Sequence, residues 1–145
     1  MLKGIPKIIP PELLKILCEM GHTDELTIAD ANFPGHSHAK KDIRMDGIGA
    51  VEILDAVLTL LPLDSYVEHP VILMQKVAGD NVPTPIWDEF EKVIARHDPR
   101  GAQCIEWIDK WEFYDRAKEQ SSVVIMSGET ALYGNVILKK GVIKD

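Results

Sequence analysis

The sequence is poor in the features that mark membrane-spanning, secreted and nucleic-acid-binding proteins. No apolar run reaches the roughly 18 residues that a membrane span needs, and residues 1–6 lack the apolar stretch and cleavage site of a secretory signal. The only basic cluster is Lys139-Lys140, in a chain of formal charge −7, whereas nucleic-acid binding requires clustered Lys and Arg. We therefore predict a cytoplasmic protein without a membrane or nucleic-acid partner.

Motifs for the common cofactors and nucleophiles are also missing. The chain contains no phosphate-binding P-loop, no Gly-rich dinucleotide fingerprint and no G-x-S-x-G elbow. Its two cysteines, Cys18 and Cys104, lie in apolar segments and are predicted to be reduced core residues rather than a disulfide. A thiolate at Cys18, among leucines in a helix, would be poorly solvated, so we expect neither a cofactor nor a catalytic cysteine.

The length of 145 residues, with 46% apolar and 27% charged residues, suits a single globular domain over residues 1–145. Helical and strand patterns alternate for most of the length, which predicts an α/β fold with a central sheet flanked by helices. The expected helices cover residues 11–20, 48–61, 85–97 and 112–120, and the expected strands cover residues 25–30, 71–74, 104–109, 123–126 and 136–138.

One histidine and one aspartate bracket the first predicted strand. His22 follows Gly21, where the first helix is expected to stop, and Asp30 ends the strand. His22 could simply favour the negative end of the helix dipole, and Asp30 could form an Asx turn. Both positions also suit proton transfer to a neutral polar substrate, because an imidazole can accept and donate a proton near neutral pH.

Two further groups of side chains are suited to binding a polyol. Tyr133, Gly134 and Asn135 precede the last strand and offer a phenol, an approachable backbone and an amide, although a simple turn is the alternative. Aromatic residues also surround Lys110, where packing is the alternative to stacking against a sugar ring. These aromatic residues are Trp107, Trp111, Phe113 and Tyr114.

The loop after Asp30 contains two histidines one residue apart, His36 and His38. Such a pair can share a metal ion, but no third ligand with suitable spacing is evident. We expect His36 to be a polar residue close to the site and His38 to be exposed, with no metal bound.

Several short segments occur in a fixed order along almost the whole chain. They are Pro11-Glu12-Leu13-Leu14-Lys15, Glu19-Met20-Gly21-His22, Asp30-Ala31-Asn32-Phe33-Pro34-Gly35-His36-Ser37, Leu63-Asp64-Ser65-Tyr66, Phe113-Tyr114-Asp115-Arg116-Ala117, Ser127-Gly128-Glu129, Tyr133-Gly134-Asn135 and Leu138-Lys139-Lys140-Gly141-Val142. In this order and spacing they resemble the family of sugar mutarotases and pyranases, which contains L-fucose mutarotase and D-ribose pyranase. The loop Phe33-Pro34-Gly35-His36-Ser37 resembles the fucose branch, since the ribose branch carries an aliphatic Leu-Pro stretch there.

The resemblance implies a cofactor-free α/β enzyme that interconverts the anomers of L-fucose or a related monosaccharide. It places the catalytic histidine at His22, the substrate-binding aspartate at Asp30 and the binding segment at Tyr133, Gly134 and Asn135. Lys110 stands where similar fucose mutarotases have a sugar-binding arginine, and a lysine cannot make the planar two-pronged contact. We expect stacking on Trp107 and Trp111 to compensate.

The resemblance further implies a homodecamer of two stacked pentamer rings, with the sugar near subunit contacts. Three alternatives remain open from the sequence: a ribose pyranase, a non-catalytic sugar-binding protein, and a metal-dependent isomerase built on His36 and His38.

Overall fold

The computed structural model describes all residues, 1–145, and contains one six-stranded sheet in the order β2-β5-β1-β6-β3-β4. The helices are α1 (Pro11–Glu19), α2 (Ala50–Leu60), α3 (Pro85–His97) and α4 (Lys110–Gln120), with one 3-10 turn, η1 (Gly101–Cys104). The strands are β1 (Glu25–Ala29), β2 (Asp42–Met45), β3 (Val71–Met74), β4 (Ile105–Ile108), β5 (Ser121–Ser127) and β6 (Val136–Lys139).

The direction of the strands gives the sheet two chemically different ends. β2, β5 and β1 are parallel to one another, β3 and β4 are parallel, and β6 pairs antiparallel with both β1 and β3. The carboxyl ends of five strands and the amino end of β6 therefore meet at one edge, here called the carboxyl edge. The opposite edge is called the amino edge. Ligands of open α/β sheets bind at the carboxyl ends of the parallel strands.

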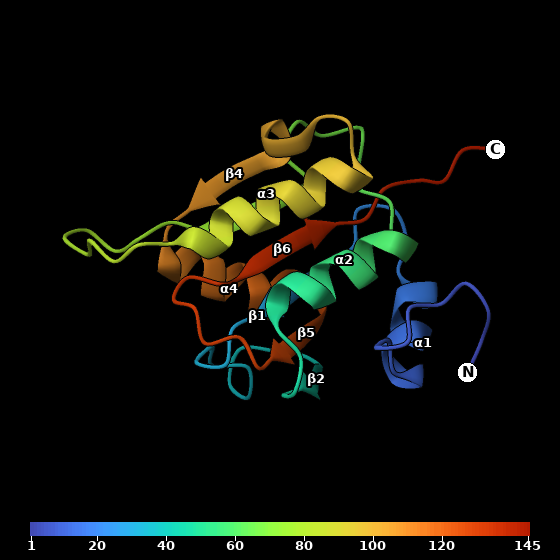
Figure 1. Cartoon of the computed structure of the whole chain (residues 1–145), viewed down its shortest axis with the longest axis horizontal. Coiled ribbons are helices and arrows are strands. Elements are labelled where there is room, and N and C mark those ends of the chain that lie inside the picture. The colour runs from blue at the N-terminus through green and yellow to red at the C-terminus, as the bar shows by residue number, and fades with distance from the viewer.

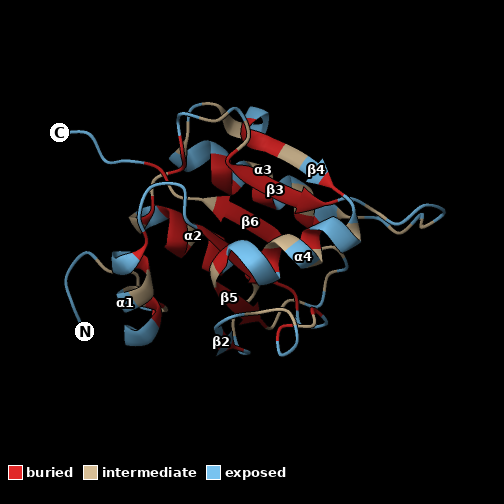
Figure 2. Ribbon diagram, turned by 180° about the vertical axis from the view of Figure 1, so that it is seen from behind, coloured by how far each residue is buried: buried red, intermediate tan, exposed pale blue.

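Helices cover both faces of the sheet, as the sequence predicted. Figure 1 shows α2 and α3 in front of the sheet, and Figure 2 shows α4 over the opposite face. Alternate strand residues divide accordingly: Leu26 and Ile28 pack into the larger core with α1, α2 and α3, whereas Ala29 and Ile72 pack into the smaller core with α4. This alternation follows from the two-residue period of a strand. The near-continuous apolar run at β3 is buried on both faces, as expected of an interior strand.

Local chemistry explains where α4 begins. The side chain of Asp109 accepts hydrogen bonds from the backbone amides of Trp111 and Glu112, which makes it the N-cap. The predicted strand over 104–109 consequently ends at Ile108, and the helix starts at Lys110 rather than residue 112. Cys104 closes η1 instead of opening the strand.

Two sequence predictions about individual segments were wrong. Strand β2 was missed because it is a four-residue edge strand with an exposed–buried alternation and no apolar run. Cys18 is exposed rather than a core residue, because α1 turns its Leu13–Leu17 face to the core and Cys18 lies off that face. Cys104 is buried as expected, and both cysteines are free. No helix is long and apolar enough to cross a membrane.

Candidate active site

Asp30 lies just past the end of β1, at the carboxyl edge, where Asn135 holds it. The Asp30 amide donates to Asn135 Oδ1 (2.8 Å), and Asn135 Nδ2 donates back to Asp30 Oδ2 (2.8 Å). The Asn32 amide donates to the other carboxyl oxygen, Oδ1 (2.9 Å). Burial raises the pKa of Asp30, and this effect outweighs the hydrogen bonds that favour the charged form. Each oxygen keeps acceptor capacity, so the carboxyl group can still receive a hydroxyl donor.

The segment before β6 brings Tyr133 to the same edge. Tyr133 has a positive φ of 60°, which is uncommon for a non-glycine residue and indicates a conformation held by its surroundings. Gly134 below it is packed so closely that an added Cβ would lie 3.1 Å from the carbonyl oxygen of Ala131. The predicted Tyr-Gly-Asn segment is therefore held rigidly. Asn135 faces Asp30, and Tyr133 is partly exposed.

Lys110, Trp111 and Tyr114 of α4 form the third part of the carboxyl edge. Together with Asp30, Asn135 and Tyr133 they are here called the carboxyl-edge cluster. Lys110 Nζ lies 4.7 Å from the ring centroid of Trp111 and 6.0 Å from that of Tyr114, a cation–π arrangement. Tyr114 meets Phe33 edge to face, with 5.2 Å between centroids. Burial raises the pKa of Tyr114, and the charges of Asp30 and Tyr133 add to the effect, which places its phenol close to both.

Trp107 does not belong to this cluster, contrary to the sequence prediction. On β4 it shares a face with Ile105 of the larger core, whereas Lys110 and Trp111 start the helix on the other face. Its ring packs against Trp87 of α3, with centroids 4.4 Å apart. Phe113 is fully buried in the smaller core and offers no surface to a ligand.

His22 lies at the amino edge, where its partner is Asp64. Its Nε2 atom is 3.1 Å from Asp64 Oδ1, and the Tyr66 amide donates to the same oxygen (3.0 Å). Burial opposes ionisation of Asp64, but these hydrogen bonds and the neighbouring charges of His22 and Lys139 prevail and lower its pKa. A charged Asp64 assigns the proton to Nε2, so Nδ1 carries the free lone pair that could accept a proton.

The backbone around His22, like that of Tyr133 at the other edge, is held in an unusual conformation by hydrogen bonds. Thr23 has a positive φ of 74°, and it and Tyr133 are the only non-glycine residues in the left-handed region. The Thr23 amide donates to the Lys140 carbonyl (2.9 Å), and the Gly21 amide donates to Asp24 Oδ2 (2.7 Å). Helix α1 ends at Glu19 with Met20 as its C-cap, so it stops just before Gly21, as predicted. Gly21 opens the turn that presents His22.

One chain does not bring His22 and Asp30 together. The strand between them has five residues and spans roughly 16 Å at about 3.3 Å per residue. One side chain lies at each edge of the sheet, and each has a different partner, Asp64 and Asn135. Because a strand holds its two flanking residues apart, the two side chains do not line one cavity within a single chain, and the prediction that both act on one sugar then requires a neighbouring chain.

The loop after Asp30 places His38, rather than His36, beside the cluster. His38 lies 5.5 Å from the Tyr114 ring and its Nδ1 is 2.8 Å from Ser37 Oγ, whereas His36 is exposed. No group of three or more His, Cys, Asp or Glu residues in the structure could hold a metal ion. The His36–His38 pair thus has no third ligand.

Sequence reasoning assigned no role to Asp64, although it belongs to a segment that carries the family resemblance, and it placed Tyr114 only among the aromatic residues around Lys110. Asp64 follows a predicted helix by a few residues, and only the antiparallel bridge between Leu63 and Lys140 brings it beside His22. Such a contact is made across the sheet edge, so spacing along the chain gives no signal for it.

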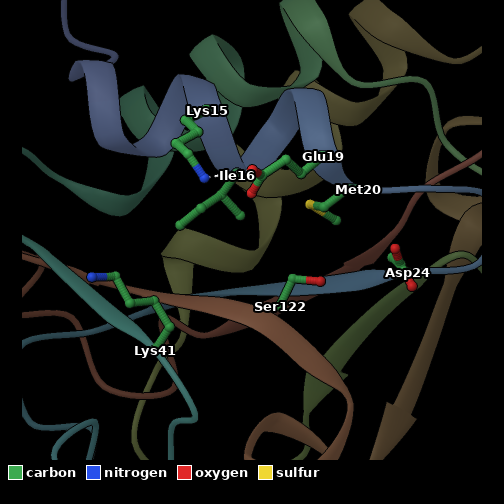
Figure 3. Close-up of a pocket in the computed structure, with 7 residues that line it drawn as sticks. All are labelled: Lys15, Ile16, Glu19, Met20, Asp24, Lys41 and Ser122. Carbon is green, nitrogen blue, oxygen red and sulfur yellow. Dashed lines mark hydrogen bonds and ion pairs between the residues drawn. The ribbon is translucent and has the colours of Figure 1, made fainter.

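A separate pocket lies between α1 and the start of β5 (Figure 3). Its lining is charged and includes neither His22 nor Asp30, so it is not part of either edge's cluster. The lining residues are Lys15, Ile16, Glu19, Met20, Asp24, Lys41 and Ser122.

Comparison with known proteins identifies the family. The model of the RbsD / FucU transport protein family matches residues 3–143. The chain belongs to this family. It is 47% identical to the fucose mutarotase of Homo sapiens, with 98% of this chain and 94% of that protein covered.

Solved structures of two family members superimpose closely on the chain. The crystal structure of FucU from Bifidobacterium longum matches with a TM-score of 0.96 and 57% identity, covering 98% of this chain and 100% of that one. The crystal structure of the fucose mutarotase from Streptococcus pneumoniae in complex with L-fucose matches with a TM-score of 0.90 and 46% identity, covering 99% and 100%. The predicted α/β fold and family are thereby confirmed.

Proposed function

We propose that the chain is an L-fucose mutarotase, an isomerase that interconverts the α and β anomers of L-fucose without a cofactor. The observation that carries the proposal is the match over nearly the whole chain to a fucose mutarotase solved with L-fucose. The carboxyl-edge cluster supports it, because a buried carboxyl group, a phenol, an amide, a cation and an exposed aromatic face are the groups that bind a polyol.

The reaction needs only proton transfers. The anomeric hydroxyl loses a proton while the ring oxygen gains one, and the bond between C1 and the ring oxygen breaks to give the open-chain aldehyde. Rotation about C1–C2 turns the other carbonyl face to the hydroxyl that re-forms the ring, and the reverse proton transfers close it. Acid–base assistance of this kind contributes about 10²–10⁴-fold in rate.

The geometry suggests distinct roles for the two edges. His22 shuttles the proton through Nδ1, while Asp64 holds Nε2 and stabilises the imidazolium that forms. Asp30 accepts a sugar hydroxyl and Asn135 keeps its carboxyl group oriented. Tyr133 and Lys110 bind further sugar oxygens. Gly134 allows the close backbone packing that holds Tyr133 in place, and Trp111 covers the apolar face of the sugar ring.

We further propose that each site is completed by two chains, the His22 edge of one meeting the Asp30 edge of the next. Both edges expose large apolar side chains that a contact would cover, such as Tyr66 (66% exposed) at the amino edge and Trp111 (67%) at the carboxyl edge. A contact between two different surfaces of one chain is heterologous, and it forms a closed ring when the rotation between neighbours closes after a whole number of subunits. This assembly agrees with the decamer of two stacked pentamers that the resemblance implies, and we retain the prediction from composition that the protein is cytoplasmic.

Mixing two inactive variants tests the composite site. His22→Ala and Asp30→Ala are each expected to be inactive, because one lacks the proton shuttle and the other lacks the hydroxyl acceptor. After the subunits have been exchanged at equal amounts, about a quarter of head-to-tail contacts regain an intact His22 and an intact Asp30. Exchange NMR on L-fucose should then detect activity approaching a quarter of the wild-type value.

The control is each variant taken through the same exchange procedure alone. If mass spectrometry shows mixed assemblies and no activity returns, the composite site is wrong. If the wild-type protein itself leaves α/β exchange at the uncatalysed rate while perturbing the sugar signals, the chain is a sugar-binding protein and not an enzyme. Activity that disappears on exhaustive chelation would favour the metal-dependent isomerase.

The same measurement on D-ribose and D-galactose tests the sugar preference. We expect L-fucose to be the best substrate, and a ribose rate above the fucose rate would favour the pyranase alternative. Lys110→Arg provides the matched variant: it restores the planar guanidinium and should tighten L-fucose binding if the cation contacts a sugar oxygen.

A further inference from the structure

The hydroxyl group of Tyr133 is held by a loop that neither the sequence motifs nor the proposed mechanism uses. Residues 75–84 connect β3 to α3 and form the loop that projects from the carboxyl edge at the left of Figure 1. Tyr133 Oη donates to Asp80 Oδ2 (2.6 Å), and the Val77 amide donates to Tyr133 Oη (3.2 Å). The loop thus contacts the phenol from 53 and 56 residues away in sequence.

Further hydrogen bonds hold the loop and the start of α3 in place around Tyr133. Asp80 Oδ1 accepts a hydrogen bond from the Val82 amide (3.1 Å), so both carboxyl oxygens are occupied. At the start of α3, Trp87 Nε1 donates to the Tyr133 carbonyl (3.1 Å). The phenol and the backbone of Tyr133 are therefore fixed by one continuous segment.

We propose that Asp80 is a positioning residue that sets the orientation and hydrogen-bonding role of Tyr133 toward the sugar. This inference rests on the proposed function, since it assumes that Tyr133 contacts the substrate. Asp80 itself need not touch the sugar: it acts through the Tyr133 hydroxyl.

The hydrogen bonds that the Tyr133 hydroxyl already makes define its role toward the sugar. A phenol has one proton to donate and two lone pairs. The proton points to Asp80, and the Val77 amide occupies one lone pair, which leaves one acceptor site. Tyr133 therefore meets the sugar as an acceptor and binds a hydroxyl that donates. Without Asp80 the phenol proton becomes free, and the hydroxyl can rotate and donate instead.

The contact helps to hold the unusual backbone of Tyr133. Asp80 is ionised at neutral pH, and a hydrogen bond to a carboxylate is stronger than one between neutral groups. The hydrogen bond from Tyr133 lowers the pKa of Asp80 further. The left-handed φ of 60° at Tyr133 has an energetic cost that such contacts must offset. A held phenol loses little freedom when the sugar binds.

A double-mutant cycle tests the proposal. Asp80→Ala, Tyr133→Phe and the double variant are compared with the wild type by exchange NMR at varied L-fucose, which separates KM from kcat. We expect Asp80→Ala to raise KM by up to about tenfold, the scale of ordering one freed side chain when the sugar binds, with a smaller change in kcat. The double variant should be no worse than Tyr133→Phe alone, because Asp80 has no effect without the phenol.

Asp80→Asn is the conservative variant. Its amide keeps an oxygen that can accept from Tyr133, so it should recover part of the lost affinity, whereas a loop that served only stability would not distinguish Asn from Ala in KM. Thermal unfolding of all variants checks that the fold is intact, which is expected because the loop carries little of the core.

Independent, multiplicative effects of Asp80→Ala and Tyr133→Phe would overturn the proposal, as would an unchanged KM in Asp80→Ala. Failure of the proposed function looks different: the wild type itself would not accelerate anomer exchange, or Tyr133→Phe would leave KM unchanged.

Discussion

Each edge of the sheet holds one aspartate close to a residue with a positive φ, and the pKa values of the two aspartates, Asp30 and Asp64, shift in opposite directions. At the carboxyl edge, burial dominates and raises the pKa of Asp30, although Asn135 and the Asn32 amide bond to it. At the amino edge, the hydrogen bonds from the Tyr66 amide and His22 outweigh burial and lower the pKa of Asp64. At Asp64 the hydrogen bonds and neighbouring charges that favour the carboxylate outweigh desolvation, whereas at Asp30 desolvation prevails.

The contrast agrees with the proposed roles, sugar binding at the carboxyl edge and proton transfer at the amino edge. Asp30 is held by neutral groups and keeps free acceptor sites, as a residue that binds neutral hydroxyls should. Asp64 is committed to an imidazole, as a residue that supports proton transfer should be. Its Oδ2 atom is buried without a hydrogen-bond partner, so its charge depends on the Oδ1 contacts.

Removing the groups at each edge should give the largest effects and separate the two roles. We expect His22→Ala to lower kcat by about 10²–10⁴-fold with little change in affinity, because the proton shuttle is lost. Asn135→Ala should instead weaken sugar binding, since it frees the Asp30 carboxyl group to rotate. Exchange NMR gives the rate and calorimetry the affinity. Equal losses of rate and affinity in both variants would abolish the distinction.

A glycine substitution sharpens the comparison at the amino edge. An Ala at Gly141 would place its Cβ 2.4 Å from the Leu63 carbonyl oxygen and 2.9 Å from Asp64 Cα. The backbone that carries Asp64 must shift, so we expect Gly141→Ala to lower the free energy of unfolding by about 1–3 kcal/mol and to reduce kcat. Gly47→Ala is the matched control, because nothing lies within 4 Å of its Cβ position. Equal melting temperatures for the two variants would contradict the expectation.

Acidification should affect the two carboxyl groups in a fixed order. Asp30 has a raised pKa and takes up its proton first, so sugar affinity is expected to fall while Asp64 is still charged. Carbon-13 NMR of the carboxyl groups, followed with L-fucose titrations, measures both. Affinity that stays constant until Asp64 titrates would show that Asp30 does not bind the sugar as a carboxylate.

The same shifts act on stability with opposite signs. The contribution of Asp30 is complete below the unfolded value of about 3.9 and is lost as pH rises through its folded pKa. The contribution of Asp64 is present above that value and is lost as pH falls through its folded pKa. Thermal unfolding against pH, with Asp64→Asn as the comparison, should show a shallower loss at low pH in the variant.

The smallest effect is expected at the aromatic rim of the carboxyl edge. Trp111 is 67% exposed and touches Lys110 by a cation–π contact, worth about 0.5–1 kcal/mol at an exposed site. We expect Trp111→Ala to weaken L-fucose binding by a few-fold without changing kcat. Unchanged affinity would remove the stacking role, which the sequence alone suggested.

Sequence patterns predicted most of the elements, because their causes are local. Alternating helical and apolar periodicities identified four helices and five strands, and Pro85 marked the start of α3. Edge strand β2 escaped detection because four residues with two exposed positions carry too little pattern. Cys18 was misplaced because a run of apolar letters does not specify which residues of a helix face the core.

The individual residues of the candidate site were found from motifs, but their grouping was not. His22 and Asp30 are near in sequence and lie at opposite edges, whereas His22 and Asp64 are 42 residues apart and in contact. Trp107 and Lys110 are three residues apart and lie on opposite faces of the sheet, because a strand ends and a helix begins between them.

By itself, the sequence determined the class of fold, the family and the inventory of groups that can bind or move a proton, since these depend on composition, local periodicity and motif order. Only the tertiary structure decided which groups meet. Pairing of strands distant in the chain put Asp64 beside His22, Asn135 beside Asp30 and a loop of residues 75–84 on Tyr133. Contacts of this kind arise from sheet order and direction, which no local stretch of sequence encodes.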